Sequence, residues 1–249
     1  MTQPIMLVTG GSRGIGAATA VLAAAHGWQV AISYKDNAAA ADEVLQKIRD
    51  AGGTAIAIRA DVSVEADVLR LFDAVDEQLG TLSALVNNAG MLEQQMRLDQ
   101  MTLDRWQRVF SANVFGSFLC AKHAVLRMST KHGGSGGAIV NVSSAAARLG
   151  APNEYVDYAA AKGAVDSMTI GLSKEVAAEG IRVNAVRPGL IHTDIHASSG
   201  EPGRVDRLKG GVPMLRGGHA EEVAEAILWL ASAQASYVTG TLMDVTGGR

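Results

Sequence analysis

Tyr158 and Lys162 are the residues whose types and spacing point most directly to chemistry. They lie four positions apart, so on a helix their side chains share one face. A phenol has an unperturbed pKa of about 10, but a neighbouring ammonium favours the phenolate and lowers that pKa. The pair could therefore act as a general acid and base, although taken alone it is more often an ordinary surface pair. Tyr155 is a weaker candidate, because Ala159 stands four residues after it and supplies no ammonium.

A glycine-rich segment, Thr9–Gly16, is the second chemical feature. Its glycines permit a tight turn and let backbone N–H groups approach a pyrophosphate at the start of a helix. The spacing is G-x-x-x-G-x-G, which is neither the common G-x-G-x-x-G fingerprint nor a P-loop. An ordinary strand-to-helix turn is the alternative for the loop alone. Because the loop follows a predicted strand and opens a predicted helix, we interpret it as a phosphate-binding loop.

Short apolar runs alternate along the chain with longer segments of helical periodicity. The predicted strands are Ile5–Val8, Gln29–Tyr34, Thr54–Arg59, Leu82–Val86, Ala138–Val142, Arg182–Val186 and Leu242–Val245. The predicted helices are Ile15–His26, Ala38–Ala51, Val64–Leu79, Leu103–Arg127, Tyr158–Glu179 and Ala220–Ala231. This alternation predicts an α/β fold with a mainly parallel sheet and helices on both faces.

The segment Gly189–Gly218 differs from the rest of the chain because it is rich in glycine and holds Pro202 and Pro213. Long irregular loops in compact domains are uncommon and often cover functional sites. We therefore expect residues 190–216 to form a mobile substrate flap. No linker or internal repeat divides the sequence, so residues 1–249 are predicted to form a single dinucleotide-binding and catalytic domain.

Six motifs in order make the sequence resemble the short-chain dehydrogenase/reductase family over nearly its whole length. They are the glycine loop, Asp61-Val62, Asn87-Asn88-Ala89-Gly90, Asn113, Tyr158-x-x-x-Lys162, and Pro188-Gly189 with Thr193. The resemblance implies a Rossmann-like, doubly wound three-layer αβα sandwich with about seven strands. Within the family, the chain is similar to glucose 1-dehydrogenase-like and 3-oxoacyl-carrier-protein reductase-like oxidoreductases.

The resemblance also assigns the reacting groups. Tyr158 would protonate the carbonyl oxygen as hydride arrives from nicotinamide C4, and Lys162 would bind the nicotinamide ribose. Asn113 would hold a water in a proton relay with Lys162; asparagine is a poor helix former inside a helix, which fits a functional role. Ser144 would bind the substrate oxygen. The family's serine usually lies thirteen residues before its tyrosine, whereas Ser144 and Ser143 lie fourteen and fifteen before, so we choose Ser144 and infer a one-residue insertion.

Further residues are expected to bind the cofactor, and they follow the first, second, third, fourth and sixth strands. They are Gly10, Ser12, Arg13, Gly14, Ile15, Gly16, Tyr34, Lys35, Asp61, Val62, Asn88, Ala89, Gly90, Pro188, Gly189, Ile191 and Thr193, besides Tyr158 and Lys162. Asp61 would contact the adenine amino group, and Pro188 to Thr193 the nicotinamide. The plainer alternatives are a helix N-cap for Asp61 and a turn for Asn88 and Gly90.

The second strand indicates which cofactor is preferred. Enzymes that use NAD typically place an acid at its end to bind the ribose 2′-hydroxyl, but here Tyr34 and Lys35 occupy those positions. Arg13 and Lys35 could bind the 2′-phosphate of NADP, which a carboxylate would repel. Asp36 is the counterargument, and it lies one or two residues beyond the expected position. NADP(H) is thus the predicted cofactor, with NAD(H) possible.

Composition narrows the remaining possibilities. A net charge of −3 and a pI of about 6.1 give no reason to expect nucleic acid or an anionic membrane as a partner. The lone cysteine, Cys120, cannot form an intrachain disulfide. Residues 1–4 show no signal peptide, and polar residues interrupt each apolar stretch before it reaches the length of a membrane span. The sequence therefore predicts a cytoplasmic enzyme without a metal site, and the resemblance suggests a homotetramer.

Two rival readings differ from an NADP(H)-dependent carbonyl reductase. One is a non-catalytic dinucleotide-binding sensor on the same fold, which would be expected to lack Tyr158, Lys162 or Ser144. The other is an NAD-preferring sugar or alcohol dehydrogenase. The substrate itself is not specified, because neither the Ala145–Val156 loop nor the flap carries a charged constellation that dictates one ligand.

Overall fold

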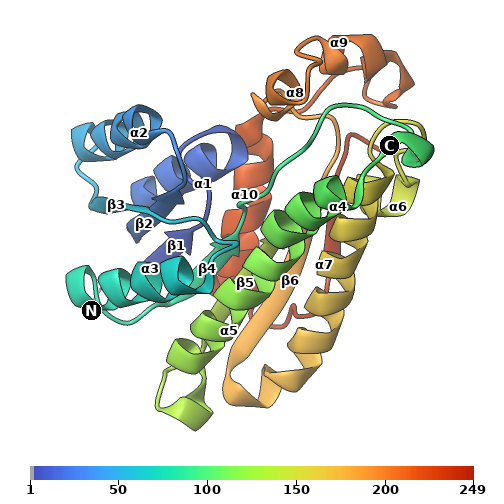
Figure 1. The fold of residues 1–249 in the computed structure, drawn as a ribbon. Coiled ribbons are helices and arrows are strands. Elements are labelled where there is room, and N and C mark those ends of the chain that lie inside the picture. Colours follow the sequence, from blue (N-terminus) through green and yellow to red (C-terminus); the bar gives the residue numbers. More distant parts are fainter. Residues whose placement is uncertain (1–2) are drawn as a thin grey trace.

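Seven parallel strands form one sheet in the computed structural model, which describes residues 3–249 (Figure 1). The prediction that residues 1–4 are not a signal peptide falls partly on Met1 and Thr2, which lie outside the described residues. The strand order is β3-β2-β1-β4-β5-β6-β7. The strands are β1 (Ile5–Val8), β2 (Gln29–Tyr34), β3 (Ala55–Arg59), β4 (Ala84–Asn87), β5 (Gly137–Val142), β6 (Ile181–Pro188) and β7 (Leu242–Val245). The predicted Rossmann-like αβα fold is confirmed.

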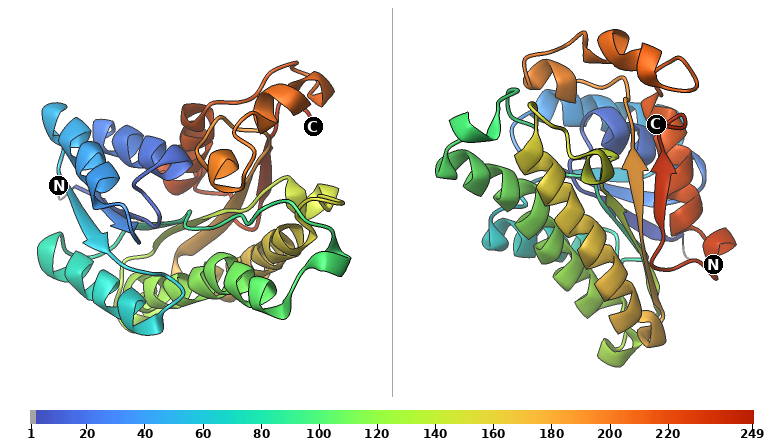
Figure 2. Two further views of the ribbon diagram at one scale, coloured as in Figure 1. Left: turned by 45° about the horizontal axis from the view of Figure 1, so that its top comes forward. Right: turned by 90° about the vertical axis from the view of Figure 1, so that its right-hand side faces the viewer.

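Helices cover both faces of the sheet, as Figure 2 shows. Helices α1, α2 and α10 lie on one face, and α3, α4, α5 and α7 lie on the other. Their bounds are α1 (Gly14–Ala25), α2 (Ala38–Asp50), α3 (Glu65–Gln78), α4 (Leu103–Phe110), α5 (Gly116–Met128), α6 (Ala146–Leu149), α7 (Val156–Glu175), α8 (Ile195–Ser198), α9 (Arg204–Leu208) and α10 (Ala220–Ala231).

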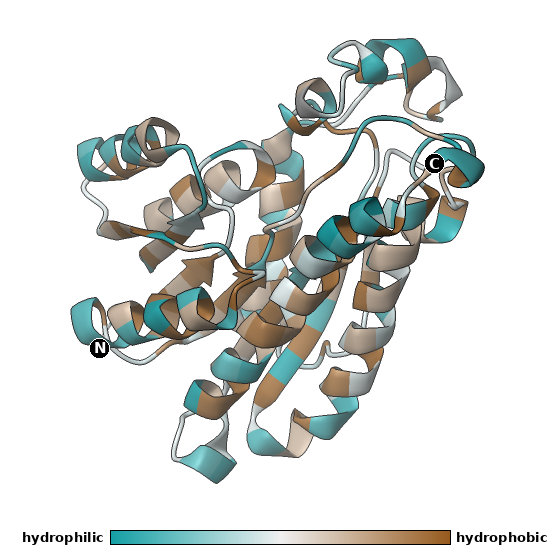
Figure 3. Ribbon diagram, in the orientation of Figure 1, coloured by the Kyte–Doolittle hydropathy of each residue, from teal (hydrophilic) through white to brown (hydrophobic). Residues whose placement is uncertain are grey.

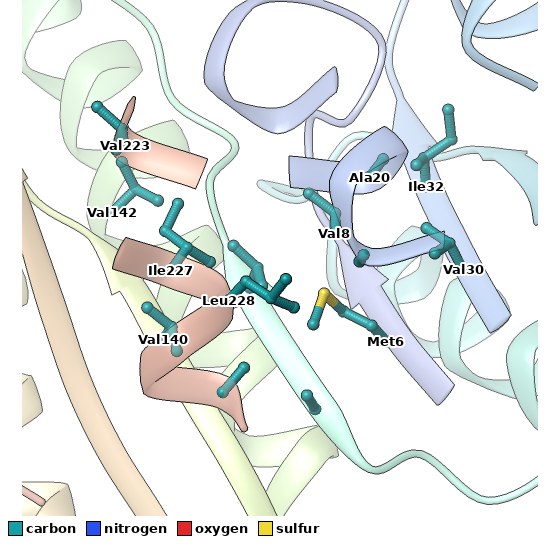
Figure 4. Close-up of a cluster of buried hydrophobic side chains, with 14 of the residues drawn as sticks. Met6, Val8, Ala20, Val30, Ile32, Val140, Val142, Val223, Ile227 and Leu228 are labelled. Atoms are coloured by element: carbon teal, nitrogen blue, oxygen red, sulfur yellow. The ribbon is translucent and has the colours of Figure 1, made fainter. Parts of the chain in front are cut away.

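Alternate residues of each strand bury their side chains in opposite layers of the core. Met6 and Val8 pack with α1 and α10 (Figure 4). Ile5 and Leu7 pack with α3 and α5. Figure 3 shows hydrophobic residues along the strands and hydrophilic residues on helices such as α2 and α4. Because both faces of the sheet are covered, most residues of its strands are apolar, as is typical of parallel sheets.

The chain reverses direction across the sheet between β1 and β4. From β1 it adds β2 and β3 on one side, then crosses to β4 on the other side of β1. Ligands of doubly wound sheets bind beyond the carboxyl ends of the strands at such a switch point. The glycine loop after β1 and the Asn88–Gly90 segment after β4 therefore meet at one edge.

The predicted helix over Leu103–Arg127 is interrupted. A π-helical turn, η2 (Ser111–Phe115), separates α4 from α5. By length and composition the stretch Leu103–Met128 could cross a membrane, so the expectation that polar residues keep every apolar stretch too short is wrong here. Half of its apolar window is nevertheless buried inside the protein, as in a core helix of a soluble protein.

The flap segment contains more regular structure than its glycine and proline content predicts. Residues 190–216 include α8, α9 and a 3₁₀ turn, η5 (Lys209–Gly211). Arg204 of α9 pairs with Glu154, which lies before α7, and with Glu201. The guanidinium of Arg204 also lies over the ring of Tyr155, 5.0 Å from its centroid. These contacts hold the segment over the carboxyl edge of the sheet (Figure 1).

Candidate active site

A cleft with a volume of about 1290 Å³ lies at the carboxyl edge of the sheet, under the flap. It brings together every predicted site residue except Gly16. The predicted residues that line it are Gly10, Ser12, Arg13, Gly14, Ile15, Tyr34, Lys35, Asp61, Val62, Asn88, Ala89, Gly90, Asn113, Ser144, Tyr158, Lys162, Pro188, Gly189, Ile191 and Thr193. Within residues 3–249, no group of three or more His, Cys, Asp or Glu side chains is placed to hold a metal ion.

The loop after β1 has the geometry of an anion cradle. Gly10 and Gly14 adopt positive φ angles of 62° and 53°, which non-glycine residues rarely adopt. A Cβ atom on Gly10 would lie 2.9 Å from Cα of Ala89. No side chain caps the N-terminus of α1, so its first N–H groups remain available to a phosphate. The local sequence therefore fits the pyrophosphate of a dinucleotide.

Gly16 does not line the cleft, but its lack of a side chain allows close packing inside the glycine loop. A Cβ atom there would lie 2.5 Å from both the side-chain nitrogen of Asn88 and the carbonyl oxygen of Gly10. Asn88 donates through Nδ2 to the carbonyls of Thr9 and Gly10, at 2.9 and 3.0 Å. The Thr9 hydroxyl in turn accepts from the backbone N–H groups of Asn88 and Ala89. Asn88 and Thr9 thus join the two loops at the switch point.

The two adjacent serines after β5 point in different directions, as expected for neighbours at a strand end. Ser143 is buried and donates its hydroxyl to the backbone carbonyl of Lys162, at 3.2 Å. Ser144 lines the cleft and forms a side-chain hydrogen bond with Tyr158. Of the two hydroxyls, that of Ser144 is the one placed beside the phenol.

Tyr158 and Lys162 occupy the first two turns of α7 and meet in the cleft. The Lys162 ammonium lies 5.6 Å from the centre of the Tyr158 ring and donates to the carbonyl of Val142 at 2.8 Å. Burial raises the pKa of Tyr158 to about 12, and the hydrogen bond with Ser144 opposes that rise, so the sequence-based expectation of a lowered pKa is wrong. Burial lowers the pKa of Lys162 to about 8. At neutral pH the phenol therefore holds its proton beside a charged lysine.

Asn113 lies at the centre of the π-helical turn and is fully buried. Its Nδ2 donates to the carbonyls of Val109 and Met91, and its Oδ1 accepts from the Met91 N–H. A Cβ atom on Gly90 would lie 2.6 Å from Oδ1 of Asn113 and 3.5 Å from Nζ of Lys162. A glycine at position 90 therefore keeps open the space between the amide oxygen and the ammonium.

The opposite end of the cleft is exposed and charged. The Lys35 ammonium, predicted to bind a 2′-phosphate, contacts Oδ2 of Asp61 at 2.7 Å, while Arg13 and Asp36 are exposed. The pKa of Asp61 is lowered: burial opposes the shift, but hydrogen bonds from Lys35 and Ser63 outweigh it. Lys35, predicted to bind the 2′-phosphate, and Asp61, predicted to bind the adenine amino group, thus form an ion pair with each other.

The segment after β6 forms the remaining wall. The Pro188 carbonyl accepts from the N–H of Ala145, and the N–H of Gly189 donates to the Val245 carbonyl of β7. Ile191 pairs with Gly218 in an isolated bridge. Thr193 approaches the glycine loop closely, because a Cβ atom on Gly14 would lie 3.3 Å from its methyl group. This wall therefore closes against the phosphate loop.

Sequence reasoning missed a buried ion pair directly beside Tyr158. Nε and the second terminal nitrogen of Arg105 donate to the two carboxylate oxygens of Asp157 at 2.7 and 3.3 Å, and both side chains are about 95% buried or more. Asp157 also accepts from the N–H of Tyr158, and Arg105 donates to the carbonyl of Gln94. The residues lie 52 positions apart, so no local spacing could reveal the pair.

Comparison with known proteins identifies relatives over the whole chain. Residues 10–249 match the family model described as enoyl-(acyl carrier protein) reductase. The chain is 60% identical to the uncharacterized oxidoreductase YgfF of Escherichia coli, covering 98% of this chain and 99% of that protein. It is 39% identical to glucose 1-dehydrogenase 2 of Bacillus subtilis, covering 100% and 95% respectively. A short-chain dehydrogenase/reductase structure from Serratia marcescens superimposes with a TM-score of 0.91 at 31% identity, covering 99% and 98% of the two chains.

Proposed function

Because this chain belongs to the short-chain dehydrogenase/reductase family of oxidoreductases, we propose that it is an NADP(H)-dependent enzyme interconverting a carbonyl and a secondary alcohol. The convergence of Tyr158, Lys162 and Ser144 in one cleft with the uncapped glycine loop carries this proposal. Bound nicotinamide supplies the hydride at C4. The protein has to orient the substrate, hold its oxygen and move one proton.

In the reduction direction, Tyr158 donates its proton to the carbonyl oxygen, and Ser144 hydrogen-bonds the same oxygen. A raised phenol pKa keeps Tyr158 protonated before the reaction. Lys162 stabilises the phenolate that results, because it carries a positive charge below its pKa of about 8. It uses one of three N–H donors on Val142, which leaves one for a ribose hydroxyl and one for a water.

The route by which Tyr158 regains its proton runs through Lys162 and Asn113. The side-chain nitrogen of Asn113 is already committed to Met91 and Val109. Its oxygen keeps a second lone pair, and the open space at Gly90 lies between that oxygen and the ammonium. We therefore assign the relay water to this space, held by Asn113 and Lys162.

Arg13 and Lys35 provide the proposed preference for NADP(H). The test is to titrate the wild type and the Arg13→Ala/Lys35→Ala variant with NADPH and with NADH, following protein fluorescence. Two charge-assisted phosphate contacts are worth about tenfold each, so we expect the NADPH preference to fall about 100-fold. Arg70→Ala/Lys122→Ala removes two charges outside the cleft and serves as the matched control. Equal affinities of the wild type for the two cofactors would exclude the preference.

A preference for NAD(H) is the second candidate, and the Lys35–Asp61 contact is the observation that favours it. If Asp61 keeps Lys35, the 2′-phosphate meets only Arg13 and an adjacent carboxylate. The same titration distinguishes the two cofactor preferences. If the enzyme prefers NAD(H), NADH should bind more tightly than NADPH, and Arg13→Ala/Lys35→Ala should leave the NADH affinity unchanged. Glucose belongs in the substrate panel on account of the Bacillus relative, together with simple ketones.

The flap, the assembly and the cellular location complete the proposal. Residues 190–216 would open and close over bound substrate through the Glu154–Arg204 contact. The exposed apolar side chains of η2, α5 and α7 include Phe115, Phe118, Leu126 and Ile170, which suits a homotetramer interface in a cytoplasmic enzyme. Light scattering after size-exclusion chromatography tests the assembly, and a monomeric mass would refute it.

A further inference from the structure

A second acidic side chain, Asp166, follows Lys162 by one helical turn on α7. Residues four apart share a helix face, so the carboxylate lies on the side of α7 that carries the Lys162 ammonium. Lys162 is 4% exposed, and its ammonium donates a hydrogen bond to a neutral backbone carbonyl, that of Val142. A buried ammonium needs a negative charge nearby to remain protonated.

The carboxylate of Asp166 is buried, and only one of its two oxygens accepts hydrogen bonds. Both donors from Arg187 of β6, Nε at 3.0 Å and a terminal nitrogen at 2.8 Å, converge on Oδ2. The other oxygen, Oδ1, is buried and has no hydrogen-bond partner. Pairing with Arg187 alone would favour a bidentate arrangement that uses both oxygens. A bare buried oxygen is costly, so its retention calls for a second role.

That role is electrostatic. Burial lowers the pKa of Lys162, and the charge of Asp166 raises it again. Among the charged side chains that the structure describes, Asp166 is the one that exerts a resolved effect on this pKa. Arg187 holds the carboxylate in place from the neighbouring strand, against which α7 packs (Figure 2).

Other charged groups on the elements around α7 are paired among themselves. Arg148 of α6 lies 3.4 Å from Asp244 of β7, which lies 3.9 Å from Arg187. Arg105 of α4 pairs with Asp157, and Glu179 of η4 (Ala177–Glu179) accepts from Ser129. On α7 itself, Tyr158 is protonated at neutral pH. Removing the charge of Asp166 would therefore take the ion-pair partner from Arg187 and the anion that raises the pKa of Lys162.

We propose that Asp166 is a positioning residue that keeps the Lys162 ammonium charged within the cleft. The inference rests on the proposed function, in which that ammonium binds the nicotinamide ribose and stabilises the Tyr158 phenolate. It extends the reacting set by a side chain that touches neither substrate nor cofactor. Its effect reaches the chemistry through the charge on Lys162.

The test measures the NADPH dissociation constant as a function of pH by protein fluorescence, so it needs no substrate. Affinity is expected to weaken as Lys162 loses its proton at alkaline pH. In Asp166→Asn, loss of the anion should move the midpoint of this weakening down by about one pH unit, the size expected for the loss of one nearby charge at intermediate dielectric. A purely structural role would change affinity by one factor at every pH and leave the midpoint in place.

A second variant separates charge from folding. Asp166→Asn/Arg187→Met also removes the cation that the first substitution leaves unpaired, so its midpoint should return toward the wild-type value. Asp73→Asn, on the exposed side of α3, is the control and should keep the wild-type profile. The inference would be overturned if NADPH affinity weakened at the same pH in the wild type and in Asp166→Asn. It would also be overturned if the weakening at alkaline pH persisted in Lys162→Met. Neither result would contradict NADPH binding itself. A wild type that binds no NADPH refutes the proposed function as well.

Discussion

The two ends of the cleft contain ion pairs of similar composition in opposite surroundings. At the end that holds Tyr158, Arg105 and Asp157 are almost fully buried. At the end that holds Arg13 and Lys35, Lys35 is 64% exposed and contacts Asp61 from the surface. Water screens the second pair and is excluded from the first. The same kind of contact therefore builds rigid geometry at one end and an adjustable, salt-sensitive surface at the other.

This difference extends to the groups proposed to carry function. Tyr158 and Lys162 have pKa values displaced to about 12 and about 8 because protein surrounds them. Strongly displaced values of this kind cluster at functional sites. Substitutions at the buried end should hence change rate, pH dependence and stability. Substitutions at the exposed end should change cofactor affinity in a way that depends on salt concentration.

The largest expected effect is on the rate. Tyr158→Phe removes the proton donor but keeps the ring, so turnover should fall by about 10²–10⁴-fold. NADPH affinity should change by no more than about threefold, because the dinucleotide contacts remain. Steady-state kinetics with a ketone panel and fluorescence titration measure the two quantities. Retention of more than a tenth of the activity would show that the proton comes from another group.

The next effect concerns stability at the same end. Arg105→Met leaves the Asp157 carboxylate buried without its partner, which should lower the free energy of unfolding by about 3–5 kcal/mol. Arg108 lies on the same helix and pairs with Glu93 and Asp104 at the surface, so Arg108→Met should lower the free energy of unfolding far less. Urea denaturation of the two variants provides the comparison. Equal losses would mean that burial does not distinguish these pairs.

The fold was predictable because it depends on local patterns. Apolar runs and helical periodicity specified every strand, and the alternation implied a parallel sheet. By contrast, the π-helical turn at Ser111–Phe115 depends on the contact between Asn113 and Met91, 22 positions away. The sequence pattern of Leu103–Arg127 reads as one helix, because its apolar spacing continues through the turn.

The site residues that belong to sequence motifs were predictable. The residues that support them through tertiary contacts were not. Residues of the glycine loop and the Tyr158–Lys162 pair line one cleft, as their motifs indicate. The partners that support them, Arg105 and Arg187, come from elements 52 and 21 positions away from the residues they bind. Neither belongs to a recognisable spacing, and burial of a charged residue cannot be seen in a sequence alone.

A third prediction uses the cost of burying Lys162. Its pKa is about 8 in the folded protein against an ordinary value of 10.5, so the folded state binds this proton less tightly than the unfolded state. Below pH 8 the charged form costs about 3 kcal/mol, and this cost disappears as pH rises toward 10.5. Lys162→Met should therefore be more stable than wild type at about pH 7, by up to about 3 kcal/mol, and lose that advantage near pH 10.

Urea unfolding at both pH values measures this difference, with turnover followed in parallel. Activity should be lost at both, so stability and function change in opposite directions at the buried end. Lys174→Met, near the C-terminus of α7 and exposed, is the control and should show no such pH dependence. A variant that is less stable than wild type at both pH values would contradict the assigned burial cost.

The smallest expected effect belongs to the exposed end. Asp61→Asn keeps an oxygen that can accept from Ser63 but removes the charge that holds Lys35 at 2.7 Å. The freed ammonium can meet a 2′-phosphate, and a repelling carboxylate is gone, so the ratio of NADPH to NADH affinity should rise about threefold at low salt. The rise should shrink as salt is added, because both charges face solvent. A ratio that falls, or one that does not respond to salt, would mean that Asp61 acts on the cofactor through a buried contact, and the contrast between the two ends of the cleft would fail at this residue.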